Sequence, residues 1–386
     1  MTASFSSPES PHRITCIVGA RPNFMKIAPI MAAFRDLTPN VHAQLVHTGQ
    51  HYDAAMNGQY FDALGIPQPD INLEVRSGSH AEQTANVMLR FESTLDASPP
   101  SAVLVVGDVN STLACALVAA KKNIPVIHVE AGLRSFDRSM PEEINRVMTD
   151  QISDLLFVTE REGCGNLLRE GIDESRIRFV GNVMIDTLRH NVGKAASVSQ
   201  ILEDAGRARF LDGRDGYAVL TLHRPSNVDD AATLRTLLEC VREMSVRLPV
   251  IFPVHPRTRQ MVERFGLARI LDAPTILQLP PVGYLQMLGL MKDARIVLTD
   301  SGGLQEETTA LGIPCVTLRE NTERPITATE GTNTIVGRDP ERILAAFDDV
   351  MRTGGKRGRI PELWDGNAAK RIALAIQEWL DATPRH

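Results

Sequence analysis

Three acidic side chains in the first half of the chain could take part in proton transfer. Asp108 follows the apolar run 102–106, Glu130 follows the apolar run 125–129, and Glu142 opens a helical pattern soon after. Short apolar runs that alternate with helical stretches are typical of strands in a parallel sheet, whose ligands bind at the carboxyl ends of the strands. We therefore predict that these carboxylates gather at one edge of a sheet and serve acid–base chemistry.

Two of these residues also have a purely structural interpretation. Asp108 could be an ordinary turn residue. Ser139-Met140-Pro141-Glu142 fits a capping box, in which Glu142 would bond to the backbone at the start of a helix. Glu130 differs, because an unpaired carboxylate at the buried end of a strand is costly and needs a partner or a function.

Cations follow the first predicted strand, 14–18. Arg21 and Lys26 belong to the turn and helix after Gly19, where helix amides and two positive charges could hold a phosphate. An arginine in such a turn can equally be a solvated surface charge. The turn has neither GxGxxG nor GxxxxGK[ST], which argues against dinucleotide-binding and Walker-type sites.

The second half of the chain repeats this arrangement. Strands predicted at 217–222 and 249–254 each end in histidine and arginine, and the strand at 294–299 ends in a Ser-Gly-Gly helix start with uncovered amides. Together they predict a phosphate site. Glu307, one turn into that helix, could accept hydrogen bonds from a ribose diol or be a solvated helix residue. The residues concerned are His223, Arg224, His255, Arg257, Ser301, Gly302 and Gly303.

The order of these patterns predicts an α/β fold of two doubly wound, Rossmann-like domains that face each other across a cleft. At 386 residues the chain is too long for one core. VLVVGD…NIPVIHVE in the first half is echoed by IVLTDSGG…GIPCVTLRE in the second. We predict a disordered tail at 1–12, a first domain at 13–190, a second domain at 191–366, and a C-terminal helix at 367–386 that packs back on the first domain.

Composition argues against several classes of function. A net charge of −6 provides no basic field for nucleic acid or an anionic membrane, and no apolar run could span a bilayer. The five cysteines are scattered without a CxxC pair, which is typical of buried thiols in a reducing compartment. His47 and His51 lie in a loop, where a plain polar loop is favoured over a metal site. We therefore expect a cytoplasmic protein.

Ten motifs occur along the chain in this order: GARPNFMKIAPI, HTGQHYD, VVGDVNST, HVEAGLRS, MPEEINR, GNVMID, TLHRPSN, PVHPRTR, TDSGGLQEE and TERPIT. Together they closely resemble the UDP-N-acetylglucosamine 2-epimerase family, from about Ile14 to the final helix. The resemblance implies a fold like that of the GT-B glycosyltransferases, no metal or redox cofactor, and a homodimer. It also implies a UDP-N-acetylhexosamine and UDP as ligands, and reversible interconversion of UDP-GlcNAc and UDP-ManNAc.

The chemistry of that reaction explains why several carboxylates are needed. The C2 hydrogen is not next to a carbonyl, so no enolate can form, and no nicotinamide-binding pattern is present to make a ketone. Elimination remains: a base takes the C2 proton as UDP leaves C1 (anti), which gives 2-acetamidoglucal. UDP then adds back (syn) while a proton arrives on the other face, so acid–base groups are needed on both faces and cations at the diphosphate.

By resemblance, four residues match catalytic positions of the family: Asp108, Glu130, Glu142 and His223. We expect Asp108 and Glu130 to flank the sugar, and His223 with Arg224 to meet the diphosphate. The predicted ligand-binding residues are Arg21, Lys26, Arg224, His255, Arg257, Val282, Met287, Ser301, Gly302, Gly303, Glu307 and Arg324.

Two stretches depart from the family pattern. Where family members often have Phe after Tyr-Leu in the uridine-side loop, this chain has Tyr284-Leu285-Gln286-Met287, and a flexible methionine can still cover a uracil. Many bacterial members also have an activator site for a second UDP-GlcNAc, built from a Gln-His loop and a later arginine. Here Gln50-His51 is followed by a different pair, Tyr52-Asp53, and Ser77-Gly78-Ser79 lacks the arginine.

Three alternative functions use much of the same machinery. A hydrolysing epimerase would release free ManNAc and UDP, and retention of UDP decides between the two outcomes. A GT-B glycosyltransferase would need an acceptor groove and would not exchange the C2 hydrogen. A non-catalytic nucleotide-sugar binder is disfavoured by the set of carboxylates.

Overall fold

The structure, a computed structural model, describes residues 12–49, 65, 67–76 and 78–382, without the side chains of Arg21 and Pro22. The chain divides into two compact units: unit 1 comprises Met1–Thr187 and Glu362–His386, and unit 2 comprises Leu188–Pro361. The chain passes from unit 1 to unit 2 after Thr187 and returns to unit 1 at Glu362, a few residues before the boundaries predicted at 190 and 366. The expected cleft between the two domains stays a prediction.

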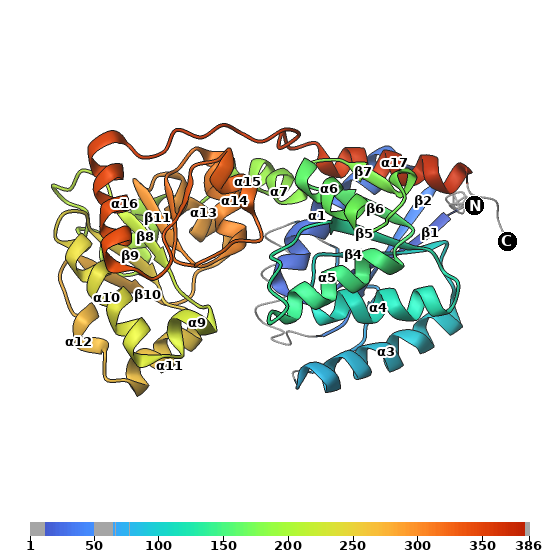
Figure 1. Ribbon diagram of the computed structural model, residues 1–386, viewed down its shortest axis with the longest axis horizontal. Coiled ribbons are helices and arrows are strands. Elements are labelled where there is room, and N and C mark those ends of the chain that lie inside the picture. Colours follow the sequence, from blue (N-terminus) through green and yellow to red (C-terminus); the bar gives the residue numbers. More distant parts are fainter. Residues whose placement is uncertain (1–11, 50–64, 66, 77, 383–386) are drawn as a thin grey trace, which may run out of the picture. The chain divides into compact units, whose positions relative to one another are not determined.

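Unit 1 contains a seven-stranded parallel sheet in the order β3-β2-β1-β4-β5-β6-β7 (Figure 1). The first strand begins at His12, which is buried, so the predicted tail is too long by this residue, and residues 1–11 lie outside the described part. The strands are β1 (His12–Val18), β2 (Val41–His47), β3 (Ile71–Asn72), β4 (Ala102–Val106), β5 (Val126–Ala131), β6 (Leu155–Val158) and β7 (Ile177–Phe179).

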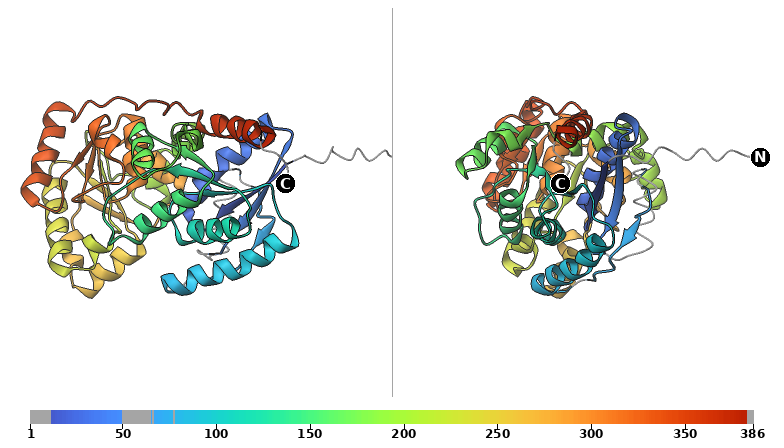
Figure 2. Two further views of the ribbon diagram at one scale, coloured as in Figure 1. Left: turned by 45° about the vertical axis from the view of Figure 1, so that its right-hand side comes forward. Right: turned by 90° about the vertical axis from the view of Figure 1, so that its right-hand side faces the viewer.

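Helices cover this sheet because its central strands are apolar on both faces. α3, α4 and α5 lie side by side along one face (Figure 1), and α17, drawn red, packs on α1 on the opposite side (Figure 2). The main helices are α1 (Arg21–Leu37), α3 (His80–Ala97), α4 (Asn110–Lys121), α5 (Pro141–Ile152), α6 (Arg161–Arg169), α7 (Val183–Asn191), which crosses into unit 2, and α17 (Ala368–Ala382).

Unit 2 contains a six-stranded parallel sheet in the order β10-β9-β8-β11-β12-β13. The order matches β3-β2-β1-β4-β5-β6 of unit 1, strand for strand. The repeat seen in the sequence therefore corresponds to β4-α4-β5 in unit 1 and to β11-α14-β12 in unit 2. The strands are β8 (Ala218–Thr221), β9 (Val250–Pro253), β10 (Ile276–Leu279), β11 (Ile296–Thr299), β12 (Cys315–Thr317) and β13 (Asn333–Ile335). The helices are α8 (Val198–Asp204), α9 (Pro225–Val228), α10 (Ala231–Ser245), α11 (Pro256–Arg264), α12 (Ala268–Leu271), α13 (Tyr284–Lys292), α14 (Gly302–Leu311), α15 (Pro325–Thr329) and α16 (Pro340–Thr353).

Each sheet has one point where the strand order reverses, between β1 and β4 in unit 1 and between β8 and β11 in unit 2. Loops leave opposite faces of the sheet there, and ligands of doubly wound folds bind at the carboxyl ends of these strands. Asp108 follows β4 and Asp300 follows β11, so both predicted clusters of functional side chains start at a reversal point.

Two further predictions concern single features. Four of the five cysteines are buried, but Cys164 is only half-buried, so the expectation of five buried thiols is wrong for this residue. Within the described residues, none of the helices combines the length and the apolar character that crossing a membrane requires.

Candidate active site

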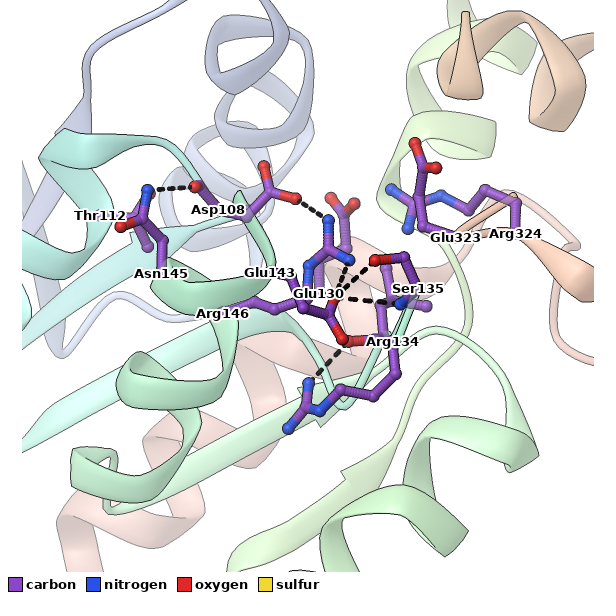
Figure 3. Close-up of polar contacts among 12 residues, drawn as sticks. Asp108, Thr112, Glu130, Arg134, Ser135, Glu143, Asn145, Arg146, Glu323 and Arg324 are labelled. Carbon is purple, nitrogen blue, oxygen red and sulfur yellow. Dashed lines mark hydrogen bonds and ion pairs between the residues drawn. The ribbon is translucent and has the colours of Figure 1, made fainter. Parts of the chain in front are cut away.

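The turn after β4 presents Asp108 at the edge of the sheet. Its carboxylate lies 2.5 Å from the Arg146 guanidinium, as Figure 3 shows, and its side chain is 28% exposed. Asn145 donates a 2.9 Å hydrogen bond to the backbone carbonyl of Asp108. Both neighbours belong to α5, which therefore fixes the direction of this carboxylate and leaves part of it accessible to a ligand.

Glu130 lies within β5 rather than after it, at a shift of the strand register between Val129 and Ala131. Its φ angle is +74°, a left-handed conformation that is strained for a residue with a side chain. A bulge of this kind turns a side chain out of the strand alternation. The side chain is only 4% exposed and its carboxylate pairs with the Lys26 ammonium.

Lys26 therefore supplies the partner that a buried Glu130 needs, although it was predicted to bind ligand. A Cβ atom on Gly107 would lie 2.9 Å from Lys26 Nζ and 4.0 Å from Glu130 Oε2. Gly107, with φ at +67°, leaves room for this pair directly beside Asp108. The structure thus brings two of the three predicted carboxylates to one turn.

The capping-box interpretation of Glu142 is wrong. α5 begins at Pro141, with Met140 as its N-cap residue and no side-chain cap bond. The Ser139 hydroxyl donates to Asp137 instead, at 2.6 Å. Glu142 is a half-buried residue of the first helical turn, on the same helix as the two residues that contact Asp108.

Glu143 occupies the third helical position of α5. Its carboxylate accepts hydrogen bonds from the backbone amides of Ser135 (3.0 Å) and Phe136 (2.9 Å), and from Arg146 (2.6 Å). Figure 3 shows Arg146 between Glu143 and Asp108. One guanidinium therefore connects the loop after β5 with the turn after β4.

The buried face of α5 is polar, whereas two of its large apolar side chains are exposed. Ile144 is 42% exposed and Met148 is 45% exposed. The helix turns its hydrogen-bonding residues inwards because they hold the β4 and β5 turns. The buried residues are Glu143, Asn145, Arg146, Thr149 and Asp150.

His128 links the same two turns from inside the sheet. Its Nδ1 lies 2.7 Å from an Asp150 carboxylate oxygen, and its Nε2 lies 2.9 Å from the Gly107 carbonyl oxygen. Each ring nitrogen of His128 therefore has an oxygen within hydrogen-bond distance. Asp150 also accepts from the Gly132 amide at 3.1 Å and pairs with Arg134 at 2.7 Å.

Of the two early histidines, only His47 lies within the described residues. His47 is buried at the end of β2, with its ring 5.4 Å from that of Phe24. His51 lies outside the described residues, as do Gln50, Tyr52, Asp53 and Ser77, which bear on the activator site. No group of three or more His, Cys, Asp or Glu side chains among the described residues is arranged to hold a metal ion.

In unit 2, His223 follows β8 and its Nδ1 lies 2.7 Å from the Asp300 carboxylate. The His255 ring centre is 5.6 Å from that of His223. His255 is the N-cap residue of α11, where its Nδ1 accepts from the Arg257 amide at 3.2 Å. The Arg257 side chain, predicted to bind ligand, forms an exposed ion pair with Asp229.

The Ser-Gly-Gly stretch forms the N-terminus of α14, with Ser301 as its N-cap residue. A Cβ atom on Gly303 would meet nothing within 4 Å, whereas one on Gly302 would lie 2.5 Å from Glu323 Oε1. The approach to the first amides of this helix is therefore open on one side, which suits an anion.

Glu307 lies on α14 with 3% of its surface exposed, so the alternative of a solvated helix residue is wrong. Burial raises the pKa of Glu307 to about 8, the Tyr284 hydroxyl lowers it, and Glu306 raises it. Its Oε1 atom has no hydrogen-bond partner among the described residues. A buried acceptor of this kind suits a sugar hydroxyl.

The remaining predicted ligand-binding residues lie near this helix or next to Tyr284 in sequence. Arg324 precedes α15 and pairs with Glu306 at 2.6 Å. Val282 precedes α13 and Met287 lies within it, and both are half-buried. For Arg21 the structure describes the backbone, as the first residue of α1, but not the side chain.

Sequence reasoning did not single out Arg146, His128 or Asp300, which the structure places in contact with the β4 turn or with His223. Arg146 is part of the MPEEINR motif, and Asp300 directly follows a buried strand, which is the rule that identified Asp108. His128 lies two residues before Glu130. Their partners are far away in the sequence, so only the position of Asp300 offered a usable signal.

Comparison with known proteins identifies the family. The family described as UDP-N-acetylglucosamine 2-epimerase matches residues 35–377. A UDP-N-acetylglucosamine 2-epimerase of Methanococcus maripaludis is 41% identical over 368 residues, which cover 95% of this chain and 98% of the relative. The chain belongs to the UDP-N-acetylglucosamine 2-epimerase family.

Other members of this epimerase family support the assignment. The crystal structure of Methanocaldococcus jannaschii UDP-GlcNAc 2-epimerase in complex with UDP-GlcNAc and UDP is 41% identical, with a TM-score of 0.84 and coverage of 95% of this chain and 99% of that one. A UDP-2,3-diacetamido-2,3-dideoxy-D-glucuronate 2-epimerase of Pseudomonas aeruginosa is 40% identical over 94% of this chain and 98% of its own. The predicted epimerase family and α/β fold are confirmed, and the roles of individual residues stay predictions.

Proposed function

We propose that this chain catalyses the reversible epimerisation of UDP-N-acetylglucosamine at C2, which gives UDP-N-acetylmannosamine. The observation that carries the proposal is the placement of Asp108 and Glu130 beside one turn, each paired with its own cation. Family membership and the UDP-GlcNAc and UDP bound to the Methanocaldococcus jannaschii relative support it.

The two carboxylates have different environments, which suits two different proton-transfer roles. Asp108 is partly exposed beside Arg146, and Glu130 is buried beside Lys26. An adjacent cation favours the ionised form of a carboxyl group, which is the form that accepts a proton. In the proposed reaction one carboxylate takes the C2 proton as the C1–O bond to UDP breaks. When UDP adds back, another acid delivers a proton to the other face of the sugar. Glu142 is a candidate for this acid beside Asp108 and Glu130.

Unit 2 supplies the residues that we propose for the nucleotide. His223 and Arg224 meet the diphosphate together with the open N-terminus of α14, where positive charge and free amides favour an anion. Glu307 accepts from the ribose diol through its unpaired oxygen. Val282 and Met287 cover the uracil, and the other proposed contacts of unit 2 are His255, Arg257, Ser301, Gly302, Gly303 and Arg324. Arg21 and Lys26, which belong to unit 1, are proposed contacts as well.

Retention of UDP distinguishes this function from hydrolysis. The glycal and UDP are both formed on the way, so a site that holds UDP re-adds it and a site that loses UDP releases free ManNAc. One observation favours a second candidate substrate, UDP-2,3-diacetamido-2,3-dideoxy-D-glucuronate. The relative named for this sugar is 40% identical to this chain, and the UDP-N-acetylglucosamine 2-epimerase of Methanococcus maripaludis is 41% identical.

One experiment tests these possibilities together. The protein is incubated with UDP-GlcNAc in D2O and followed by NMR, in parallel with the diacetamido glucuronate substrate. Deuterium at C2 and intact UDP-ManNAc are expected. Free ManNAc would identify a hydrolysing enzyme, and turnover of the glucuronate alone would move the proposal to that sugar. No exchange with either substrate would contradict epimerase activity.

The homodimer and the cytoplasmic location implied by the sequence are also proposals. Because the chain has a mass of 42.4 kDa, sedimentation at micromolar concentration should give a species of twice that mass. A single species with the mass of one chain would contradict the dimer. Fractionation of the cells that express the protein tests its location, and recovery in the membrane fraction would contradict a cytoplasmic one.

A further inference from the structure

Asp300 is a carboxylate with several hydrogen-bond donors around it, and the sequence analysis left it without a role. It is fully buried and lies directly after β11, at the point where the strand order of unit 2 reverses. Its oxygens accept from the His223 amide (2.9 and 3.1 Å), the Arg224 amide (2.9 Å) and the Asn227 side-chain amide (3.1 Å). The His223 ring supplies a further donor, with Nδ1 at 2.7 Å from Asp300 Oδ1.

These contacts keep the carboxylate ionised. Burial raises the pKa of Asp300, but the hydrogen bonds and the charge of His223 and the bonds from the backbone amides outweigh it, so the net pKa lies below its ordinary value. Every neighbour named above donates, and a protonated carboxyl would place its own hydrogen against a donor. An ionised Asp300 in turn requires hydrogen on Nδ1 of His223.

The consequence for His223 is a fixed ring orientation. With Nδ1 held as a donor in both charge states, only Nε2 can gain or lose a proton. The side chain of His223 is 35% exposed, whereas that of Asp300 is fully enclosed. A carboxylate behind a histidine selects its tautomer and favours its charged form, as in other acid–base sites.

We propose that Asp300 is the positioning residue of a His223–Asp300 pair, which presents a charged Nε2–H group to the β-phosphate oxygen that leaves C1 of the sugar. No covalent bond to the protein forms: the Nε2–H group donates to the oxygen that receives the electron pair of the broken C1–O bond. The same group holds UDP until it adds back. This inference rests on the proposed function, because it assigns the leaving oxygen as the ligand of Nε2.

Other charged groups lie near His223 along the chain or through ion pairs. Arg224 follows it in the chain and lies 3.6 Å from Glu323, which pairs with Arg319 at 2.8 Å. The His255 ring lies beside it. Asp300 is the residue among them that contacts the ring nitrogen directly, so its removal should change the pH dependence most.

The first test compares Asp300→Asn, His223→Gln and the double variant, with Asp348→Asn as a matched control on an exposed ion pair of the same unit. Asp300→Asn should lower kcat about 100-fold or more, within the range found when the carboxylate behind a catalytic histidine is removed. It should also move the alkaline limb of the kcat–pH profile to lower pH, because the charged ring loses its counter-ion.

The double variant separates positioning from a general structural role. If Asp300 acts through His223, the double variant should be no slower than His223→Gln alone. The proposal would be overturned if the kcat losses of the two single variants multiplied in the double variant. It would also be overturned if the alkaline limb of the kcat–pH profile did not move in Asp300→Asn. Asp348→Asn should retain the wild-type profile.

A second measurement needs no variant at position 300 and no turnover. In the wild-type protein with UDP bound, 15N NMR of the His223 ring, assigned by its loss in His223→Gln, should show hydrogen on Nδ1 from pH 5 to pH 9. A lone pair on Nδ1 at high pH would overturn the proposal even if Asp300→Asn fails to fold. An intact Nδ1–H signal in a protein that shows no C2 exchange would instead count against the proposed function and leave the pair standing.

Discussion

Asp108 and Glu130 lie beside the same turn but differ in exposure, and this difference determines how each responds to substitution. Asp108 keeps 28% of its side chain accessible, whereas Glu130 keeps 4%. Arg146, although buried, also pairs with Glu143 and so keeps a partner when the charge of Asp108 is removed, whereas Lys26 and Glu130 pair with each other in a closed space. Chemistry at Asp108 is therefore the easier of the two to test without damage to the fold.

Asp108→Asn should abolish C2 deuterium exchange and leave UDP affinity within a factor of about 3, because the amide cannot accept the proton and unit 2 is unchanged. Exchange is followed by NMR and UDP binding by calorimetry. Asp96→Asn, on an exposed pair with Lys122, is the control that should behave as wild type. Normal exchange in Asp108→Asn would remove this residue from the mechanism.

Glu307 should make unit 2 less stable as the pH rises. The folded state raises the pKa of Glu307 from 4.5 to about 8, so its stabilising contribution is present below pH 4.5 and is lost as the pH rises through 8. Glu307→Gln mimics the protonated form at every pH. Relative to wild type, it should therefore gain at least about 1 kcal/mol in the free energy of unfolding between pH 5 and pH 9.

Urea unfolding followed by circular dichroism measures this gain. Both tryptophans, Trp364 and Trp379, belong to unit 1, so their fluorescence reports that unit and provides an internal control. Glu239→Gln, an exposed change on α10, should show no pH-dependent gain. An equal pH response of wild type and Glu307→Gln would show that Glu307 is ionised in the folded protein at pH 5.

At the scale of elements, α5 is a helix whose polar side is its buried side. Packing normally hides the apolar side of a surface helix, yet here the inward side chains hold two turns through hydrogen bonds. Arg146 contacts Asp108 in the turn after β4 and Glu143 in the first turn of α5. The position of the turn after β4 therefore depends on a helix that apolar periodicity would orient the other way.

Arg146→Met should lower the free energy of unfolding by about 3 kcal/mol, because it leaves the buried Glu143 without its ion-pair partner. It should also slow C2 exchange by disorienting Asp108. Met148→Lys, on the exposed side of the same helix, should stay within about 0.5 kcal/mol of wild type. Urea midpoints and deuterium exchange measure both effects, and equal stability of the two variants would contradict the buried role of Arg146.

At the scale of the whole molecule, the two units share the order of their first six strands but present different side chains where that order reverses. The reversal point of unit 1 presents carboxylates, and that of unit 2 presents histidines, arginines and helix amides. A sheet of this kind positions whatever side chains follow its strands, so the division of labour lies in the turns and not in the sheets.

UDP should therefore protect one unit before the other. In hydrogen-exchange mass spectrometry of the full chain, UDP should slow exchange in peptides that contain residues 221–227 and 299–307, and in the loop before α13. Peptides from the β4 and β5 turns should change little until UDP-GlcNAc is added. Protection by UDP that is confined to residues 107–112 would contradict the assignment of the nucleotide to unit 2.

The amino-acid sequence by itself determined the α/β class, the position of most strands and helices, and the epimerase family. These follow from local patterns: apolar runs of strand length, helical periodicity, and motifs such as HVEAGLRS that stay contiguous along the chain. Asp108, Glu130 and His223 were identified in this way because each follows or ends a buried strand.

Only the tertiary structure decided which partners these residues have. The pairs Lys26–Glu130, Arg146–Asp108 and His223–Asp300 join residues that are far apart in the sequence. The bulge at Glu130 and the polar buried side of α5 were likewise invisible, because a strand or helix pattern predicts periodicity and not what the neighbouring element requires. Contacts across a sheet edge depend on the register of strands, which no local pattern encodes.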